Sequence, residues 1–218
     1  MYILVFDITA SGVIAGLYKD KARKAYVEKV MEYGQAEELA VSVKKFLDDE
    51  NILFDEVGLV GVGVGPGSFT GVRSGVAFAK GLVLANDKTL ITGVSSFDVY
   101  KEMLSEDKRA YYNAVVIETK REDFYFQLFD ENMKKISEPL ALTRDEIKDR
   151  VKGRQVSFIG DGVERLLSVP MGLQLKSVEI VQSVEVEPLF EAVYKKYLEK
   201  TLDFPKPLYI RNAVACVK

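Results

Sequence analysis

The chain contains no histidine, and this absence excludes more chemistry than any other feature of its composition. A Ser-His-Asp or Cys-His nucleophile system, a His-x-x-x-His metal pair and an imidazole general base all require that residue. Cysteine occurs once, at Cys216, so an intramolecular disulfide and a cysteine-based zinc site are excluded as well. We interpret Cys216 as a small residue near the tail. Any catalysis by this chain would therefore rest on carboxylates, Lys, Tyr or groups from another protein.

Long apolar runs are also missing. No stretch reaches the roughly 18 apolar residues of a transmembrane helix, so we expect no membrane partner. The start of the chain, residues 1–7, lacks the basic segment and small-residue cleavage site of a signal peptide, and reads as a buried strand. We therefore expect a cytoplasmic protein. The formal net charge of −3, with 33 acidic and 30 basic residues interspersed, gives no electrostatic footprint for nucleic acid.

What the chain does contain is alternation of strands and helices. The 218 residues, 48% of them hydrophobic, fit one large domain or two small ones. Apolar periodicity predicts strands at 2–8, 13–18 and 24–31, a helix at 35–49 and a fully buried strand at 59–64. A glycine loop and a helix to about 85 come next, followed by a strand at 90–94 and a short helix to about 104.

A similar order starts again after residue 112. Strands are predicted at 114–118, 124–129 and near 136–142, and Thr143 opens a capping box that begins a helix to about 152. A strand at 156–160 ends in Gly-Asp-Gly, and Pro188 lies near the first turn of a helix to about 200. The shared strand-strand-strand-helix-strand order fits an internal duplication, although the residues themselves are only faintly similar. We place the domain boundary near 100–112.

The most informative segment is GVGVGPGSFTGVRSG at residues 61–75. It is rich in glycine, follows a strand and opens a helix, which presents backbone N–H groups and a helix N-terminus to an anion. It matches neither common nucleotide motif, because G-x-G-x-x-G fails in every register and no Lys follows the glycines as a P-loop requires. Two interpretations stay open from the residues alone: a tight strand-to-helix turn capped by Ser68 or Thr70, or a phosphate-binding loop.

The helix after this loop carries small residues in two rows. The rows are Gly71, Gly75, Ala79 and Ala77, Gly81, Ala85. Each interior glycine costs roughly 1 kcal/mol relative to alanine, and close approach of another backbone is the usual compensation. The helix therefore packs closely either on the protein's own sheet or against a helix of another chain, with the 35–49 helix beside it.

Residues 65–75, GPGSFTGVRSG, closely resemble the G-P-G-S-F-T-G-[LV]-R-x-G signature of TsaB (YeaZ-type) proteins. Three other stretches agree in position. Residues 4–7 with the hairpin to Leu17 are similar to the family's N-terminal D-T-[ST]-T hairpin. Residues 160–162 resemble its second-half G-x-G, and residues 207–212, PLYIRN, resemble its P-x-Y-[LI]-R-x tail. The resemblance runs through the whole chain, and its first motif is highly specific.

This resemblance implies an α/β fold of two domains, of the actin, hexokinase and heat-shock-chaperone (ASKHA) superfamily. Each domain is then a mixed β-sheet with flanking helices, and the two are related by duplication. We expect an actin-like domain with the partner-binding helices at residues 1–104. A smaller C-terminal domain is expected at 105–218, with a tail after about residue 205 that is able to pack back on the first.

The resemblance also implies a role. TsaB proteins are non-catalytic partners of TsaD, the transferase that makes N6-threonylcarbamoyladenosine (t6A) at adenosine 37 of ANN-decoding tRNAs. The implied partners are TsaD, the ATPase subunit TsaE and a second copy of this chain, and tRNA is reached only indirectly through the complex. TsaD holds a metal through His-x-x-x-His on its first helix, whereas the corresponding residues 35–39 here are QAEEL. No catalytic or metal-binding residue is therefore expected.

Two sets of residues carry these expectations. Pairing through the first two helices implies interface positions at Leu39, Val43, Gly71, Val72, Gly75 and Ala79. If the superfamily's nucleotide site persists, its candidates are Asp7, Thr9, Gly65, Gly67, Ser68 and Thr70. We expect no tightly bound cofactor, and ATP or ADP only at the interface of the complex.

The alternative function is a small ATPase or kinase of the same superfamily, in which Asp7 holds Mg-bound water and the 65–70 loop contacts phosphate. Two departures from the family weigh against nucleotide binding by this chain alone. The family's Asp-Thr-x-Thr is DITA at residues 7–10, and its second-half Asp-Ala-Arg is ETK at 118–120. A metalloprotease, the older glycoprotease label of the broader family, is excluded because the chain has no histidine to bind the metal.

Overall fold

A computed structural model describes residues 1–10, 12–84 and 86–210 of the chain. The chain divides into two compact units, which are considered one at a time. Unit 1 comprises Met1–Val99 and Val184–Leu208, and unit 2 comprises Tyr100–Ser183 with the end of the chain from Tyr209. Some residues discussed from the sequence lie outside the described part, namely Ala85, Arg211, Asn212 and Cys216.

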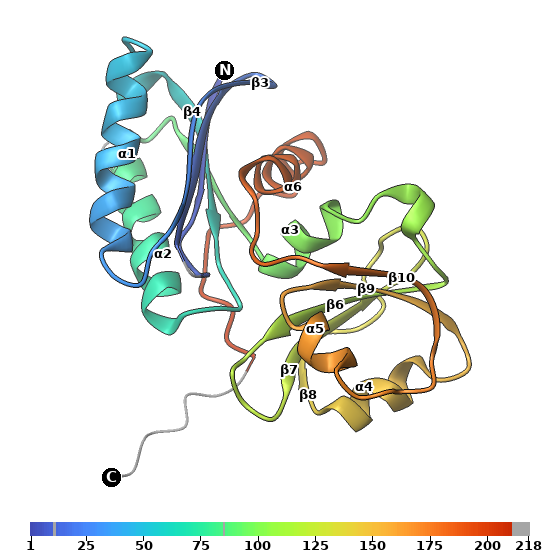
Figure 1. Ribbon diagram of the computed structural model, residues 1–218. Helices are drawn as coiled ribbons and strands as arrows, with labels where there is room; N and C mark the ends of the chain where they lie inside the picture. The colour runs from blue at the N-terminus through green and yellow to red at the C-terminus, as the bar shows by residue number, and fades with distance from the viewer. Residues whose placement is uncertain (11, 85, 211–218) are drawn as a thin grey trace. The chain divides into compact units, whose positions relative to one another are not determined.

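Unit 1 is built on a mixed sheet of five strands (Figure 1). The strands are β1 (Tyr2–Asp7), β2 (Gly12–Lys19), β3 (Ala22–Val30), β4 (Val57–Gly63) and β5 (Leu90–Val94). Their order across the sheet is β3-β2-β1-β4-β5. β2 is antiparallel to both β1 and β3, whereas β4 is parallel to both β1 and β5. The parallel strands therefore end together at one edge of the sheet.

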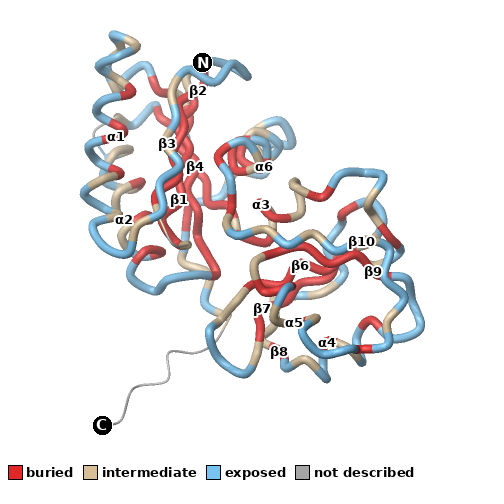
Figure 2. Tube along the Cα trace, viewed as in Figure 1, coloured by how far each residue is buried: buried red, intermediate tan, exposed pale blue. Residues whose placement is uncertain are grey.

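Both faces of this sheet are covered, because its central strands are apolar on both sides. Residues 3–6 of β1 are completely buried (Figure 2). On one face lie α1 (Gln35–Asp49) and α2 (Phe69–Leu84), and on the other lies α6 (Val186–Leu198) (Figure 1). Val186 and Val193 of α6 pack directly over Gly16 and Gly61, where a side chain would leave them no room.

The position of α6 corrects the domain boundary expected from the sequence. Residues 105–218 were expected to form the second domain, yet the segment Val184–Leu208 belongs to unit 1. The physical reason is the apolar second face of β1 and β4, which needs a cover that the first 104 residues do not supply. Tyr18 of β2 marks the contact, since its ring stacks on Phe190 with the ring centres 3.8 Å apart.

Unit 2 repeats the strand order of unit 1. Its strands are β6 (Tyr112–Glu118), β7 (Phe124–Phe129), β8 (Leu140–Leu142), β9 (Gln155–Gly160) and β10 (Gln174–Ile180). They lie in the order β8-β7-β6-β9-β10, so that β6 takes the place of β1 and β9 that of β4. β7 is antiparallel to β6 and β8, and β9 is parallel to β6 and β10. The recurrence seen in the sequence is thus present in the topology.

Two helices complete the core of unit 2. α4 (Arg144–Val151) and α5 (Val163–Leu167) pack their apolar residues against β6, β7 and β9. The remaining elements of the described chain are short. They are η1 (Phe54–Glu56), a 3-10 turn of unit 1, α3 (Ser96–Glu102), and the 3-10 turn η2 (Glu106–Lys108) of unit 2. No helix in the described part of the chain is long and apolar enough to cross a membrane.

The predicted elements are largely confirmed, with three differences in unit 2. The strand expected near 136–142 is shortened to Leu140–Leu142, preceded by an isolated bridge between Phe129 and Lys135. Helix α5 and strand β10 were not predicted. α5 is a helix of only five residues, and β10 is an edge strand in which charged residues interrupt the apolar ones.

Candidate functional site

The glycine loop lies where the parallel strands of unit 1 end. It begins after Gly63 of β4 and leads into α2 at Phe69, beside the end of β1. In open α/β sheets, ligands bind in the crevice outside the carboxyl ends of the strands. A ligand site in unit 1 is therefore expected at this edge of the sheet.

Asp7, the last residue of β1, is the acidic group of this edge. Its side chain is 1% exposed, and its Oδ1 accepts a hydrogen bond from the Thr9 amide at 2.6 Å. Its Oδ2 has no hydrogen-bond partner among the described residues, and burial raises the pKa of the carboxyl above its usual value. A Cβ on Gly63 would lie 1.9 Å from Oδ2, so this close approach of two strands requires glycine.

The loop itself is bonded to the protein's own backbone. The Ser68 amide donates to the Thr9 carbonyl at 2.7 Å, and the Ser68 hydroxyl accepts from the Gly71 amide at 3.3 Å. A Cβ on Gly67 would lie 2.4 Å from the Thr9 oxygen. One amide that a phosphate would need is thus already used, and Ser68 caps the helix. The geometry is that of the tight strand-to-helix turn.

Other segments of unit 1 hold the loop in place from the side. The Ser96 amide donates to the Gly65 carbonyl at 2.9 Å, and its hydroxyl donates to the Pro66 carbonyl at 3.1 Å. The Leu208 amide donates to the Val64 carbonyl at 2.9 Å. The edge where a ligand is expected is therefore occupied in part by the chain's own later residues.

Of the six nucleotide candidates, the structure brings together Asp7, Thr9, Gly67 and Ser68 around the end of β1. Gly65 is buried beneath the side chain of Val72, and Thr70 lies exposed in the first turn of α2.

The six interface candidates lie inside unit 1 rather than on its surface. Their residues are buried in unit 1: Leu39, Val43, Gly71, Val72, Gly75 and Ala79. A Cβ on Gly71 would lie 2.1 Å from the Ile8 carbonyl oxygen, and one on Gly75 would lie 3.3 Å from an Ile8 side-chain carbon. The first small row of α2 therefore packs closely within unit 1, over the end of β1 and on β4, which fits the alternative of packing on the protein's own sheet.

The two described residues of the second small row, Ala77 and Gly81, face outward. Ala77 is exposed, and a Cβ on Gly81 would meet nothing within 4 Å. Leu84 follows at 87% exposure, and on α1, which contacts α2, Val41 is 67% exposed. A shallow hollow lies on α1 itself, lined by Ala40, Val41, Lys44, Lys45, Asp48 and Asp49. Small and apolar groups thus lie exposed on both helices.

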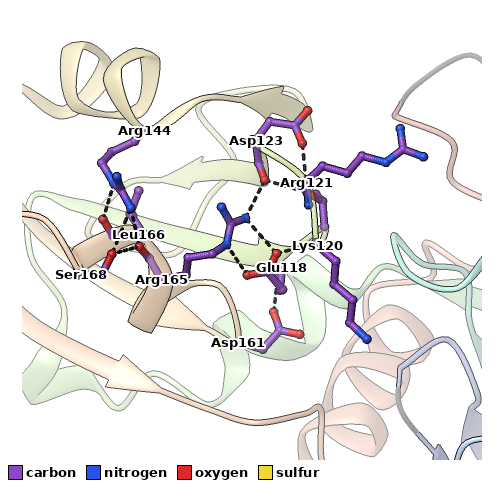
Figure 3. Close-up of polar contacts among 10 residues, drawn as sticks. Glu118, Lys120, Arg121, Asp123, Arg144, Asp161, Arg165, Leu166 and Ser168 are labelled. Atoms are coloured by element: carbon purple, nitrogen blue, oxygen red, sulfur yellow. Dashed lines mark hydrogen bonds and ion pairs between the residues drawn. The ribbon is translucent and has the colours of Figure 1, made fainter.

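Unit 2 holds a polar cluster at the corresponding edge of its sheet (Figure 3). Arg165 of α5 donates to both carboxylate oxygens of Glu118, at 2.6 and 2.8 Å. The Glu118 amide donates to Asp161 Oδ1 at 2.9 Å. Burial raises the pKa of Asp161 to about 6. Burial also disfavours ionisation of Glu118, but the hydrogen bonds and charge of Arg165, together with the Lys120 and Thr119 amides, outweigh it, and the pKa of Glu118 lies below its usual value.

The strand end at Glu118 and the Gly-Asp-Gly at 160–162 stand out in the sequence, but the sequence does not indicate that Arg165 binds there. The available signal was the repeated topology, which puts the ends of β6 and β9 side by side as it does those of β1 and β4. Arg165 follows on the short helix after Gly162.

Comparison with known proteins identifies the family. The family model described as "TsaD: tRNA N6-adenosine threonylcarbamoyltransferase" matches residues 33–188. The chain belongs to this family. Within the family it is of the TsaB (YeaZ) type that the sequence resembles, and two curated relatives have that name.

The relatives are distant in sequence but similar in length and fold. The tRNA threonylcarbamoyladenosine biosynthesis protein TsaB of Escherichia coli K12 is 24% identical over 229 aligned positions, with 100% of this chain and 98% of the relative covered. TsaB of Buchnera aphidicola is 21% identical over 169 aligned positions, which cover 75% of this chain and 76% of that protein. The structure of YeaZ from Pseudomonas aeruginosa superposes with a TM-score of 0.80 at 17% identity. The superposition covers 95% of this chain and 99% of the YeaZ chain. The predicted α/β fold of two mixed β-sheets with flanking helices is thereby confirmed.

Proposed function

We propose that this chain is a non-catalytic subunit of the cytoplasmic machinery that makes t6A in tRNA. It binds and supports TsaD, the transferase that modifies adenosine 37 of ANN-decoding tRNAs. The curated relatives are named as biosynthesis proteins of this modification, and the chain belongs to the TsaD family. The absence of histidine distinguishes it from the metal-binding transferase that the resemblance describes.

The observation that carries the non-catalytic role is the occupied glycine loop. The Ser68 amide is bonded to the Thr9 carbonyl, and the Val64 carbonyl beside it is bonded to the Leu208 amide. A catalytic phosphate site needs amide groups that point at the ligand. Here the Ser68 amide is bonded to the protein's own backbone instead, which supports a fold retained for its surfaces.

The exposed side of α1 and α2 is the surface we propose for TsaD. Gly81 and Ala77 allow a partner backbone to approach closely, and Val41 and Leu84 offer apolar area for burial. The same surface would serve a second copy of this chain, with TsaE joining the assembly of this chain and TsaD. This replaces the six buried positions expected from the sequence and keeps the same two helices.

Co-elution with the cognate TsaD tests this surface. The wild-type chain should form a larger species with TsaD on size-exclusion chromatography at micromolar concentration. Val41→Arg should weaken the pair at least about tenfold, because a charge would be buried at the interface. The matched control is Leu198→Arg, which places the same side chain at a 59% exposed position of α6, on the opposite face of the sheet. Separate peaks for the wild-type proteins, or equal loss with both variants, would contradict the proposal.

Reconstitution of tRNA modification tests the role. TsaD and TsaE with threonylcarbamoyl-adenylate and an ANN-decoding tRNA should yield t6A at position 37 only when this chain is present, as measured by nucleoside mass spectrometry. Asp7→Asn should leave the yield unchanged, since Asp7 has no chemical role in this proposal. Loss of t6A with a correctly folded Asp7→Asn protein would instead indicate a catalytic subunit.

A small ATPase or kinase is the second candidate, and Asp7 Oδ2 is the observation that favours it. A buried carboxylate oxygen without a hydrogen-bond partner among the described residues is the kind of group that a cation or its water would satisfy. Isothermal titration of the isolated chain with Mg-ATP separates the two candidates. Sub-millimolar binding would favour the ATPase, whereas heat only in the presence of TsaD would place ATP or ADP at the interface of the complex.

A further inference from the structure

The turn between β6 and β7, residues 119–123, is fixed by hydrogen bonds from its own side chains. The Thr119 hydroxyl donates to the Asp123 carbonyl at 2.7 Å and accepts from the Arg121 amide at 3.2 Å. The Lys120 amide donates to Glu118 Oε1 at 2.5 Å. Lys120 has a φ of 55°, a left-handed conformation that is rare for a side chain of this size. The hydrogen bonds on both sides of Lys120 stabilise this conformation.

Arg165 connects this turn to the body of unit 2 (Figure 3). Its guanidinium binds both oxygens of Glu118 at the start of the turn and the Asp123 carbonyl at its end, the latter at 2.9 Å. Its plane also lies over the Phe124 ring, 3.8 Å from the ring centre. A planar fork that binds two ends at once holds them at a fixed separation. The backbone of the turn is thus rigid.

The two cations of this turn, Lys120 and Arg121, have no side-chain partner in the described part of the chain. Figure 3 shows the side chains of Lys120 and Arg121 extending away from the Glu118–Arg165 pair. Both are exposed, and within the described part of the chain neither side chain has a hydrogen bond or an ion pair. A fixed backbone with free basic side chains is arranged to meet an external anion.

Among the described residues, the nearby acidic groups do not pair with these two cations. Glu118 is paired with Arg165, and Asp123 Oδ1 shares the Thr119 hydroxyl proton with the Asp123 carbonyl, at 3.0 Å from the hydroxyl oxygen. Asp161 accepts from the Glu118 amide within the cluster. Glu122 is the one exposed acid between Lys120 and Phe124, and it reduces the local charge without pairing with either cation in the described structure.

We propose that the Lys120–Arg121 turn contacts phosphate groups of the tRNA backbone when this chain is assembled with TsaD. The inference rests on the proposed function and refines it, because the sequence led us to expect only indirect contact with tRNA. An arginine binds phosphate through two parallel N–H donors, and a lysine supplies a point charge. Because the turn is already ordered, little conformational entropy is lost when it binds. Two contacts add to an affinity supplied mainly by the rest of the complex, consistent with the chain's net negative charge.

The salt dependence of tRNA binding tests this contact. The complex of this chain with its TsaD is titrated with a fluorescent ANN-decoding tRNA at several KCl concentrations. Removal of two phosphate contacts by Lys120→Ala with Arg121→Ala should make the slope of log K against log salt less negative by about 1.8. Affinity at 0.1 M KCl should fall on the order of tenfold.

Two matched controls separate this contact from general charge effects. Glu122→Gln in the same turn removes an acid and should leave binding as tight or tighter. Arg150→Ala with Lys152→Ala removes two exposed cations of the α4 region and should leave the slope unchanged.

An unchanged slope in the Lys120–Arg121 variant, with the complex intact on size exclusion, overturns the tRNA contact. Failure of that variant to bind TsaD also overturns it, in favour of an acidic protein surface. If the wild-type chain itself does not bind TsaD, the proposed function fails rather than the turn.

Arg165 is a positioning residue in this proposal, and Arg165→Lys tests it. Lysine keeps the charge but cannot bind Glu118 through two N–H groups and reach Asp123 as well. The affinity for tRNA should fall several-fold while the salt slope stays that of the wild type, since the number of phosphate contacts is unchanged. A loss of slope equal to that of the Lys120–Arg121 variant would mean that Arg165 itself contacts phosphate, which contradicts the positioning role.

Discussion

Glycine has two different roles within α2, and the difference is decided at single positions. Gly71 lies against the Ile8 carbonyl oxygen, where a Cβ would approach to 2.1 Å, whereas Gly81 has open space around its Cα. From the sequence the two positions look alike, because each belongs to a row of small residues spaced by one turn. Only the contacts across the sheet separate a glycine needed for packing from one that is free to change.

A pair of alanine substitutions measures this difference. Gly71→Ala should destabilise the protein by at least about 2 kcal/mol, because backbone atoms cannot move aside as a flexible side chain does. Gly81→Ala should stabilise it by up to about 1 kcal/mol through helix propensity. Urea denaturation followed by circular dichroism gives both values. Equal effects at the two positions would show that the first row does not pack on Ile8.

Asp7 is expected to make stability depend on pH. Burial raises its pKa in the folded protein above the unfolded value, so its contribution is fully present below the unfolded pKa near 3.8. That contribution is lost as pH rises through the folded pKa. Asp7→Asn cannot ionise, so it should gain stability relative to the wild type as the pH rises above the unfolded pKa near 3.8, by about 1.4 kcal/mol per unit of pKa shift. Denaturant midpoints of the two proteins as a function of pH provide the measurement, and a difference independent of pH would refute it.

Among the elements, α4 illustrates how a local signal is enough to place a helix. Thr143 was predicted to open a capping box, and its hydroxyl accepts from the Glu146 amide at 3.4 Å while Glu146 accepts from the Thr143 amide at 2.8 Å. These bonds satisfy donors that a helix start otherwise leaves free. The box involves neighbours in sequence only, so no knowledge of the tertiary structure was needed.

The cap can be removed without disturbing the core. Thr143→Ala should cost about 1 kcal/mol, as is typical for loss of a helix N-cap. Thr143→Ser keeps the hydroxyl and should cost a few tenths of that at most. Thermal unfolding monitored by circular dichroism distinguishes the two variants, and an equal loss in both would mean that the methyl group, not the hydrogen bond, is responsible.

The elements that the sequence missed depend on distant partners. β10 exists because β9 offers it a parallel edge, and α5 is a helix of five residues whose apolar side chains point into the core of unit 2. The glycine loop was recognised as a turn or a phosphate site, but the choice between them required the Thr9 and Leu208 contacts, the second of them across more than 140 positions of the chain. Periodicity and caps report local structure, whereas occupation of a site by another segment does not appear in local sequence.

At the scale of the whole molecule, the chain returns to its first unit after completing most of its second. The sequence showed the repeat and the approximate crossover, yet it assigned α6 to the second half because α6 follows β10 along the chain. The amphipathic pattern of α6 predicts that it covers a sheet but not which one. In the structure α6 covers the sheet of unit 1, because Val193 packs on Gly61 and Phe190 stacks on Tyr18.

Fragments of the chain test this division. A fragment of residues 1–104 should lack a cooperative unfolding transition, because without α6 one apolar face of β1 and β4 is open to water. Addition of residues 184–208 as a separate peptide should restore the transition, since it supplies the missing cover. The comparison fragment 100–183 contains the described core of unit 2 and should unfold cooperatively alone. Near-ultraviolet circular dichroism in urea reports all three, and a sharp transition in residues 1–104 alone would show that the unit is complete without its C-terminal helix.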